Sequence, residues 1–346
     1  MSYPTSACRC AAAGDPPHLL PVPRGAGIAN PGGLILPRGA PWQASHVRVA
    51  TIGNFDGVHR GHQGLVGRAV RRAGDDGSAV VVTFDPHPVS VLRPDRAPAR
   101  LTTLDRRIAL LERAGADEVI VLPFTPQLAA QTPAEFARLL RDPEGINADV
   151  VIVGRNFRFG KRAAGDVETL TELGRDLVFA VDVVDLVAEE IPGRGSVILS
   201  STYVRDRIAE GDMRGAKAVL GRPHRLEGPV IEGDRRGREL GYPTANVEVE
   251  PGLAVPPEGV YAGYLAAGDD TRLPAAISVG TNPQFGGHEM RVEAYVIGRD
   301  DLDLYDTHVG LEFVERLRGQ QVFPRVDALV EQMSRDVAAA SALLDG

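Results

Sequence analysis

The chain has 346 residues, which at roughly 150 residues per domain predicts about two domains. Hydrophobic residues make up 43% and charged residues 24% of the sequence, as expected for a globular protein with packed cores. The formal net charge of -8 disfavours a general nucleic-acid binder, and no apolar run reaches the ~18–20 residues of a membrane helix. Two cysteines in a chain of this length exclude a disulfide framework and a cysteine-rich zinc module.

Residues 1–46 differ in composition from the rest of the chain. They contain eight prolines and six glycines and show neither helical nor strand periodicity, which predicts a disordered N-terminal extension. Cys8 and Cys10 lie in this segment and could form a metal or redox pair. We favour two free thiols, because no further Cys or His cluster completes a site. A misassigned translation start is a further hypothesis for this segment.

Residues 47–221 alternate strand-like and helix-like segments, which predicts a first domain over this range. Runs such as AVVVTF and DVVIV are apolar on both faces, as in strands buried within a parallel sheet. We therefore expect a doubly wound parallel α/β sheet, which binds ligands at the carboxyl ends of its strands. The expected strands are 47–52, 79–84, 118–122, 149–153 and 177–184, and the expected helices are 62–73, 104–114, 133–140 and 167–173.

The segment TIGNFDGVHRGH, residues 51–62, lies where the first expected strand ends and the first helix begins. Gly53, Gly57 and Gly61 permit tight turns and the close approach of a ligand. The following helix offers free N–H groups, which make its start a natural phosphate site, with His59 and His62 beside it. A His-x-x-His metal pair and two incidental surface histidines are the alternative interpretations.

A second domain is expected over 222–346, after two short helices at 203–209 and 213–220 and the helix-breaking Gly221-Arg222-Pro223. Short alternating strands at 226–231, 260–265, 275–279 and 290–297 are separated by turns, which predicts a small antiparallel β-barrel. The apolar positions of 325–344 recur on one face, so a C-terminal helix is expected to pack on that barrel.

Five further motifs follow in order: TFDPHP at 83–88, GRNFRFG at 154–160, SSTYVR at 200–205, GYPTAN at 241–246 and SVGTNP at 278–283. Together they give the chain a family resemblance over about residues 47–344. With the His-containing segment, the chain resembles the HxGH nucleotidyltransferase superfamily and, within it, the bacterial bifunctional riboflavin kinase/FAD synthetase family. This resemblance implies a Rossmann-like domain that transfers AMP from ATP to FMN, giving FAD and pyrophosphate, followed by a barrel that phosphorylates riboflavin to FMN.

For the adenylyl-transfer half, the resemblance implies positioned donors around the ATP phosphates. His59, His62 and Arg205 take the catalytic role, because adenylyl transfer needs charge stabilisation more than covalent chemistry. Ser200 to Thr202 also suit a helix N-cap whatever the function, and 156–159 also suit a loop with a packed aromatic pair. The implied ATP-binding residues are Gly53, Phe55, Asp56, Gly57, Gly61, Ser201 and Thr202, and the implied flavin-binding residues are Asn156 and Phe157.

For the kinase half, alternation along 290–297 places Arg291, Glu293 and Tyr295 on one side of a strand. The resemblance makes Glu293 the general base that accepts the proton of the riboflavin 5′-hydroxyl, whereas the pattern alone equally fits a cross-strand ion pair. It also implies that Thr244 and Asn246 hold Mg²⁺ and the ATP phosphates, although 243–246 alone suit a turn. Gly237, in a Gly- and Arg-rich loop, is an ATP-binding candidate or part of a solvated hairpin, and Arg291 is a flavin-binding candidate.

Three positions depart from the family pattern. Ile198 stands where many relatives have a basic residue, Arg155 where an acidic or small residue is common, and Asp306 where glycine is common. We expect a cytoplasmic two-domain enzyme that uses ATP, Mg²⁺, riboflavin and FMN, with no nucleic-acid or membrane partner. One alternative is an enzyme with a single active half, which would be the kinase because Ile198 departs from the pattern of the other half. The other alternative is a flavin-nucleotide sensor without turnover.

Overall fold

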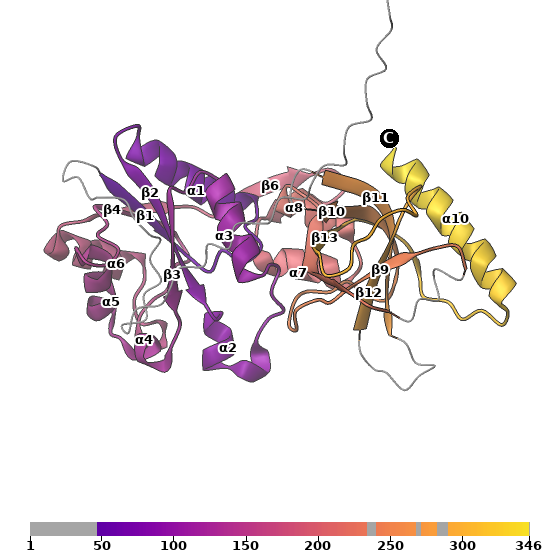
Figure 1. The fold of residues 1–346 in the computed structure, drawn as a ribbon. Coiled ribbons are helices and arrows are strands. Elements are labelled where there is room, and N and C mark those ends of the chain that lie inside the picture. The colour runs from indigo at the N-terminus through magenta and orange to yellow at the C-terminus, as the bar shows by residue number, and fades with distance from the viewer. Residues whose placement is uncertain (1–46, 234–239, 268–270, 282–289, 346) are drawn as a thin grey trace, which may run out of the picture.

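The computed structural model describes residues 47–233, 240–267, 271–281 and 290–345. The expected N-terminal extension with its two cysteines, Gly237 and the last two residues of SVGTNP lie outside the described residues. Figure 1 shows an α/β module and a β-barrel side by side, with two helices between them and the C-terminal helix on the outer side of the barrel. The expected combination of a parallel α/β fold and an antiparallel barrel is confirmed.

The α/β module is built on a parallel sheet whose strands lie in the order β3-β2-β1-β4-β5. Its central strands are buried along almost their whole length, which explains their unbroken apolar sequences. The strands are β1 (Arg48–Ile52), β2 (Ser78–Asp85), β3 (Glu118–Pro123), β4 (Val150–Gly154) and β5 (Ala180–Val184).

Helices cover both faces of this sheet, as a doubly wound fold requires. Alternate strand residues face opposite ways, so Val81 packs with α1 and α3, whereas its neighbours Val80 and Val82 pack with α5 and α6. The covering helices are α1 (Arg60–Ala73), α3 (Leu104–Arg113), α5 (Pro133–Arg141) and α6 (Val167–Leu177).

Several short elements were not expected, and one expected strand was too long. The expected strand 177–184 begins at Ala180, because α6 continues to Leu177 and ends in the left-handed Val178. The unexpected elements are α2 (Pro88–Leu92), α4 (Pro126–Ala130), 3-10 turns at Pro94–Arg96 and Lys161–Ala163, and the hairpin β6 (Ala188–Ile191) and β7 (Gly195–Ile198).

Two helices, α7 (Ser201–Ala209) and α8 (Met213–Leu220), connect the α/β module to the barrel. The helix α8 ends at Gly221, whose φ of 76° is readily adopted by glycine and closes the helix. The buried side chains of both helices, among them Val204, Ile208 and Val219, belong to the same apolar cluster as the barrel interior. The connecting helices therefore share their core with the barrel.

The barrel closes in the order β10-β11-β12-β9-β8-β13, and every neighbouring pair is antiparallel. The C-terminal helix α10 (Val326–Leu344) packs against β10 and β11, and Arg318 of β13 holds its buried Asp336 through bonds of 2.7–3.0 Å. Neither β9 nor β13 was expected. The strands are β8 (His224–Ile231), β9 (Thr244–Val247), β10 (Gly259–Ala267), β11 (Thr271–Thr281), β12 (Met290–Val296) and β13 (His308–Gly319).

Candidate active sites

His59 and His62 lie at the start of α1, directly after the loop that leaves the carboxyl end of β1. His59 is the N-cap of the helix, and its Nδ1 accepts a hydrogen bond of 3.4 Å from the backbone N–H of His62. Because Nδ1 is an acceptor, the ring proton of neutral His59 lies on Nε2. The two rings stack with centroids 3.6 Å apart, and the ring of Phe55 packs on His62 in a T-shaped arrangement with centroids 5.1 Å apart.

Both histidines are neutral at pH 7. Burial, with smaller contributions from Arg222 and Arg205, lowers the pKa of His59 to about 4. Burial also places the pKa of His62 well below its usual range, with His59 and Arg205 acting in the same direction. Such a pair supplies neutral N–H donors to an anion. Among the described residues no cluster of three His, Cys, Asp or Glu side chains surrounds a metal position.

Two glycines of this loop are required by close contacts. Gly57 has a φ of +79°, and a Cβ there would lie 2.6 Å from the Leu101 side chain. A Cβ at Gly61 would lie 3.1 Å from the His59 ring. The glycine spacing therefore lets the loop and the first turn of α1 fold tightly around His59.

The start of α7 lies beside this loop and contributes polar groups to it. Ser200 is the N-cap of α7, as the N-cap interpretation expects, and Ser201 Oγ donates to the backbone carbonyl of Asp56 at 2.8 Å. Arg205, one turn further along, forms an ion pair of 2.5 Å with buried Asp56, whose other oxygen accepts from the backbone N–H of Leu101 at 2.9 Å. Thr202 lies exposed on the same turn.

The segment after β4 lies at the same edge of the sheet, because β4 pairs directly with β1. Asn156 is exposed there, and the ring of Phe157 stacks on Phe159 with centroids 5.5 Å apart. The packed aromatic pair expected in one interpretation is therefore present, and it supports the loop that carries Asn156. Arg155 is paired in an exposed salt bridge with Asp185, the residue directly after β5, so a counter-ion balances the charge that departs from the family pattern.

A second polar group at this edge was missed as a site from the sequence. Asn54 Nδ2 lies 3.3 Å from Nε2 of His87, the N-cap of α2 in the TFDPHP motif. The backbone carbonyl of Asn54 accepts from Arg107 at 3.0 Å, and Arg107 also contacts Asp85 at 3.2 Å. The TFDPHP motif could have indicated that His87 belongs to the site. No sequence pattern indicated that Arg107 of α3 would contact Asn54 and Asp85.

The barrel brings the kinase candidates together across neighbouring strands. Asn246 of β9 is directly opposite Glu293 of β12, which is in turn opposite Ser278 of β11. Directly opposite side chains share a face of the sheet, with Cβ atoms about 5 Å apart. The interpretation of 243–246 as merely a turn is wrong, because Thr244 to Asn246 lie within β9. Arg291 lies two residues before Glu293 on the same face, and it is exposed.

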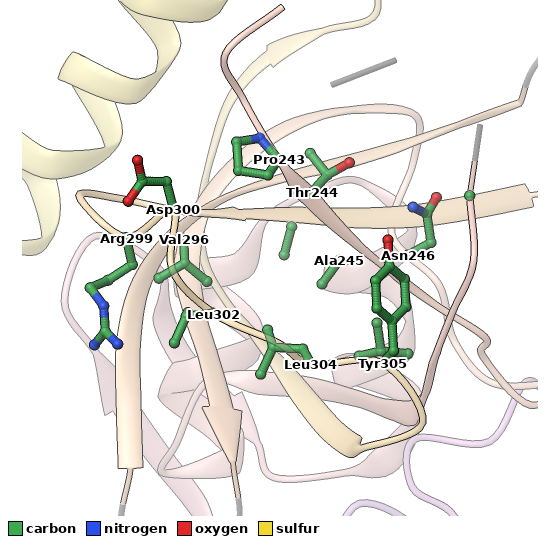
Figure 2. A pocket seen from close by; sticks show the side chains of 13 residues that line it. Pro243, Thr244, Ala245, Asn246, Val296, Arg299, Asp300, Leu302, Leu304 and Tyr305 are labelled. Atoms are coloured by element: carbon green, nitrogen blue, oxygen red, sulfur yellow. The ribbon is translucent and has the colours of Figure 1, made fainter. Parts of the chain in front are cut away.

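A pocket opens at the end of the barrel beside these strands (Figure 2). Thr244 and Asn246 supply hydroxyl and amide groups to its wall, and Leu302 and Leu304 supply apolar surface. Tyr305 also lines it, and Asp306 follows in the left-handed conformation with a φ of 59°. The departure from glycine at 306 thus retains the turn, since Asp adopts this conformation more easily than most residues. The lining segment 299–305 was not predicted from the sequence.

The fold and the two sites together define a transferase with an α/β nucleotidyltransferase module and a barrel kinase module. Residues 42–199 match the FAD synthetase family and residues 220–344 match the riboflavin kinase family. Bifunctional riboflavin kinase/FMN adenylyltransferases resemble the chain closely: that of Escherichia coli K12 is 33% identical and that of Pseudomonas fluorescens 38% identical. These matches cover 84% and 85% of this chain and 91% and 92% of the relatives. The chain belongs to this bifunctional family, which confirms the resemblance seen in the motifs.

One solved structure has a similar fold along most of the chain. A crystal structure described as a macrolide-efflux protein from Streptococcus pneumoniae superposes with a TM-score of 0.74 at 30% identity, covering 86% of this chain and 95% of its own. In the part of this chain that the structure describes, every helix is too short or too polar to cross a membrane.

Proposed function

We propose that this chain catalyses two transfers at separate sites. At the barrel, the γ-phosphoryl group of ATP moves to the 5′-hydroxyl of riboflavin and leaves ADP. At the α/β module, FMN attacks the α-phosphorus of a second ATP, and pyrophosphate leaves as FAD forms. Family membership supports both reactions, and nothing favours a single active half or a sensor without turnover. Division at about residue 221 and action in the cytoplasm, where ATP is supplied, belong to the same proposal.

For adenylyl transfer, the supporting observation is the convergence of donors from two segments that are far apart in sequence. His59 and His62 at the start of α1 and Ser201 and Arg205 at the start of α7 meet around the loop that contains Asp56. Preorganised N–H and guanidinium donors stabilise the negative charge that develops on the α-phosphate and pyrophosphate. The neutral His59 presents its Nε2 proton for this role, while Asp56 fixes the orientation of Arg205.

We place the ATP phosphates against the loop that contains Gly53, Gly57 and Gly61, because glycines let a ligand come close to the backbone. The Phe55 side chain is fully buried against His62, so it supports this histidine instead of contacting ATP directly. The flavin ring is placed toward Asn156 and Phe157 at the end of β4, at the same edge of the sheet. Ile198 is 54% exposed on β7, so it offers apolar surface at the position where the family resemblance leads us to expect a basic residue.

For riboflavin phosphorylation, the supporting observation is the direct pairing of Asn246 with Glu293 across β9 and β12. Glu293 accepts the proton of the 5′-hydroxyl as that oxygen attacks the γ-phosphorus, a role that requires a carboxylate beside the phosphate-binding groups. Thr244 and Asn246 then hold the nucleotide phosphates, and the apolar wall of the adjacent pocket suits the adenine ring. Arg291 contacts the flavin on the same face.

The residues at the barrel site also fit a magnesium ion. Thr244 and Asn246 supply neutral oxygen ligands, which suit a hard cation. Mg²⁺ usually takes only one or two protein ligands and completes its shell with water and phosphate oxygens, so a third protein ligand is not needed. When bound there, the ion would neutralise charge on the transferred phosphoryl group.

Chromatography of the products tests both reactions. The full chain is incubated with riboflavin, ATP and MgCl₂, and we expect FMN to form first and FAD to follow. FMN without FAD would contradict adenylyl transfer, FAD made from added FMN but not from riboflavin would contradict the kinase, and the absence of both products would favour a sensor.

A further inference from the structure

Arg222 lies in the junction between α8 and β8, at the point where the barrel module begins. Its side chain extends back to the α/β module, where Nη2 donates to the backbone carbonyl of Gly57 at 2.7 Å and Nη1 donates to that of Val58 at 3.2 Å. The next residue in the chain is His59. A guanidinium from the second module therefore holds the two carbonyls that directly precede the first histidine.

The loop that Arg222 contacts has an unfavourable backbone conformation. Phe55 and Val58 have φ angles of 48° and 39°, in the left-handed region that non-glycine residues rarely adopt, and Gly57 has a φ of 79°. Non-glycine residues in this conformation are strained and persist only where surrounding contacts determine their conformation. A β-branched residue such as Val58 is especially unsuited to this region. The loop therefore depends on bonds from outside itself.

Gln63 of α1 strengthens the same connection. Its Nε2 donates to the carbonyl of Val58 at 2.9 Å and to the carbonyl of Leu220 at 3.1 Å, so it links the loop to the end of α8. Arg222 Nη1 also approaches the carbonyl of Leu220 at 3.3 Å. The carbonyls of Gly57, Val58 and Leu220 thus meet at one point, and Arg222 is the charged donor there.

We propose that Arg222 is a positioning residue for adenylyl transfer, through which the barrel module holds the histidine loop of the α/β module in its reactive conformation. This inference rests on the proposed function of His59. The guanidinium donates to the carbonyl of Gly57 and shares that of Val58 with Gln63, and it thereby holds the backbone directly before His59, the N-cap of α1. The adenylyltransferase site is therefore completed by a residue that follows the expected domain boundary.

The charges around the junction are consistent with this role. Glu227 and Glu312 of the barrel favour the charged form of Arg222, while burial and the neighbouring Arg106 and Arg225 oppose it, giving a pKa of about 10. Arg222 is still protonated at neutral pH. Its positive charge in turn keeps His59 neutral, alongside burial and Arg205. Arg222 thus holds the backbone before His59 and adds to the effect of burial on its pKa.

Substitution of Arg222 in the full chain tests this inference, with the two activities measured separately. In Arg222→Gln we expect the kcat for FAD formation from FMN and ATP to fall about 10- to 100-fold, because small misplacements of a catalytic group have effects of this size. The KM for ATP should change less than about threefold and FMN formation from riboflavin less than about twofold. Arg222→Lys, which retains a cationic donor, should recover part of the lost rate.

Arg214→Gln is the matched control. Arg214 of α8 pairs with Glu315 of β13, so its ion pair links α8 to the barrel and does not involve the histidine loop. We expect both activities of this variant to remain at the wild-type level. Unchanged FAD formation in Arg222→Gln would overturn the inference, as would an equal loss of both activities or a Lys variant no better than Gln. Failure of the wild-type chain to make FAD would instead overturn the proposed function.

Discussion

The two candidate sites are assembled in contrasting ways. In the α/β module, groups from the loop after β1, from α7 and from the junction at Arg222 meet although up to 165 residues separate them. In the barrel, Asn246, Glu293 and Ser278 are neighbours simply because their strands pair in register. The first site therefore depends on how whole elements pack, and it is exposed to changes at remote positions. The second depends on one sheet and is sensitive mainly to its own residues.

The largest expected effect is on the barrel site alone. Glu293→Gln removes the proposed general base while retaining the size and polarity of the side chain, so FMN formation should fall about 10³-fold. Conversion of added FMN to FAD should continue at the wild-type rate, as measured by chromatography of the two reactions. Loss of both activities in a folded variant would show that the sites are not independent.

The second prediction concerns the α/β site. His59→Ala removes one donor to the phosphates and the N-cap of α1, and FAD formation should fall about 10²-fold or more. Riboflavin phosphorylation, followed in the same preparation, serves as the control for folding and should be retained. An undiminished FAD yield would show that the assignment of His59 is wrong.

The third prediction is a loss of stability in acid. The pKa of His59 is about 4 in the folded protein and 6.5 in the unfolded chain, so the unfolded chain takes up a proton first as the pH falls. The free energy of unfolding should therefore decrease by about 3 kcal/mol from this residue between pH 6.5 and 4. His224 of the barrel, with a pKa also near 4, contributes in the same direction.

Urea unfolding at a series of pH values measures this effect. His59→Asn keeps an N-cap residue but cannot titrate, so its stability should fall less steeply over the same range. Identical pH dependence in the variant and the wild type would contradict the assigned protonation of His59.

The smallest expected effects are changes in stability when a Cβ is added to a glycine in each module. A Cβ on Gly228 of β8 would lie 1.8 Å from the carbonyl oxygen of Glu248, so Gly228→Ala should destabilise the barrel by about 2–3 kcal/mol. Gly64→Ala in α1 meets no atom within 4 Å and should stabilise the α/β module by about 0.5–1 kcal/mol. Thermal unfolding of the two variants should therefore shift in opposite directions, and equal shifts would contradict the packing described here.

Much of the α/β module was predictable because its signals are local. The strand 79–84 is apolar on both faces, and the glycine spacing of 51–62 indicates a phosphate-binding turn at a strand end. The strand β13 was missed because its 12 residues, HVGLEFVERLRG, mix charged and apolar residues without a clean alternation. The hairpin of β6 and β7 was missed for a different reason, because strands of only four residues are too short to show a periodic pattern.

The candidate site was predictable only as far as its motifs extend. The sequence indicates that His59 and Arg205 belong together through family resemblance, but not that Asp56 holds Arg205, since this pair spans 149 residues. Arg222 appeared only as part of a helix-breaking joint. Its bonds to Gly57 and Val58 arise from tertiary packing, which no local pattern of residue types encodes.

The apolar cluster shared by α7, α8 and the barrel bears on how the two activities can be divided. A shortened protein that began at residue 222 would keep every barrel strand yet lose Val204, Ile208, Met213 and Val219, all of which are almost completely buried. Loss of such partners would leave a hydrophobic surface facing water, the kind of patch that promotes aggregation. A kinase fragment that stays monodisperse should therefore begin before α7. Such a fragment would contain Ser201 and Arg205, so a cut at that point would remove both residues from the adenylyltransferase site. The two enzymes overlap at these helices, so no single cut yields both intact.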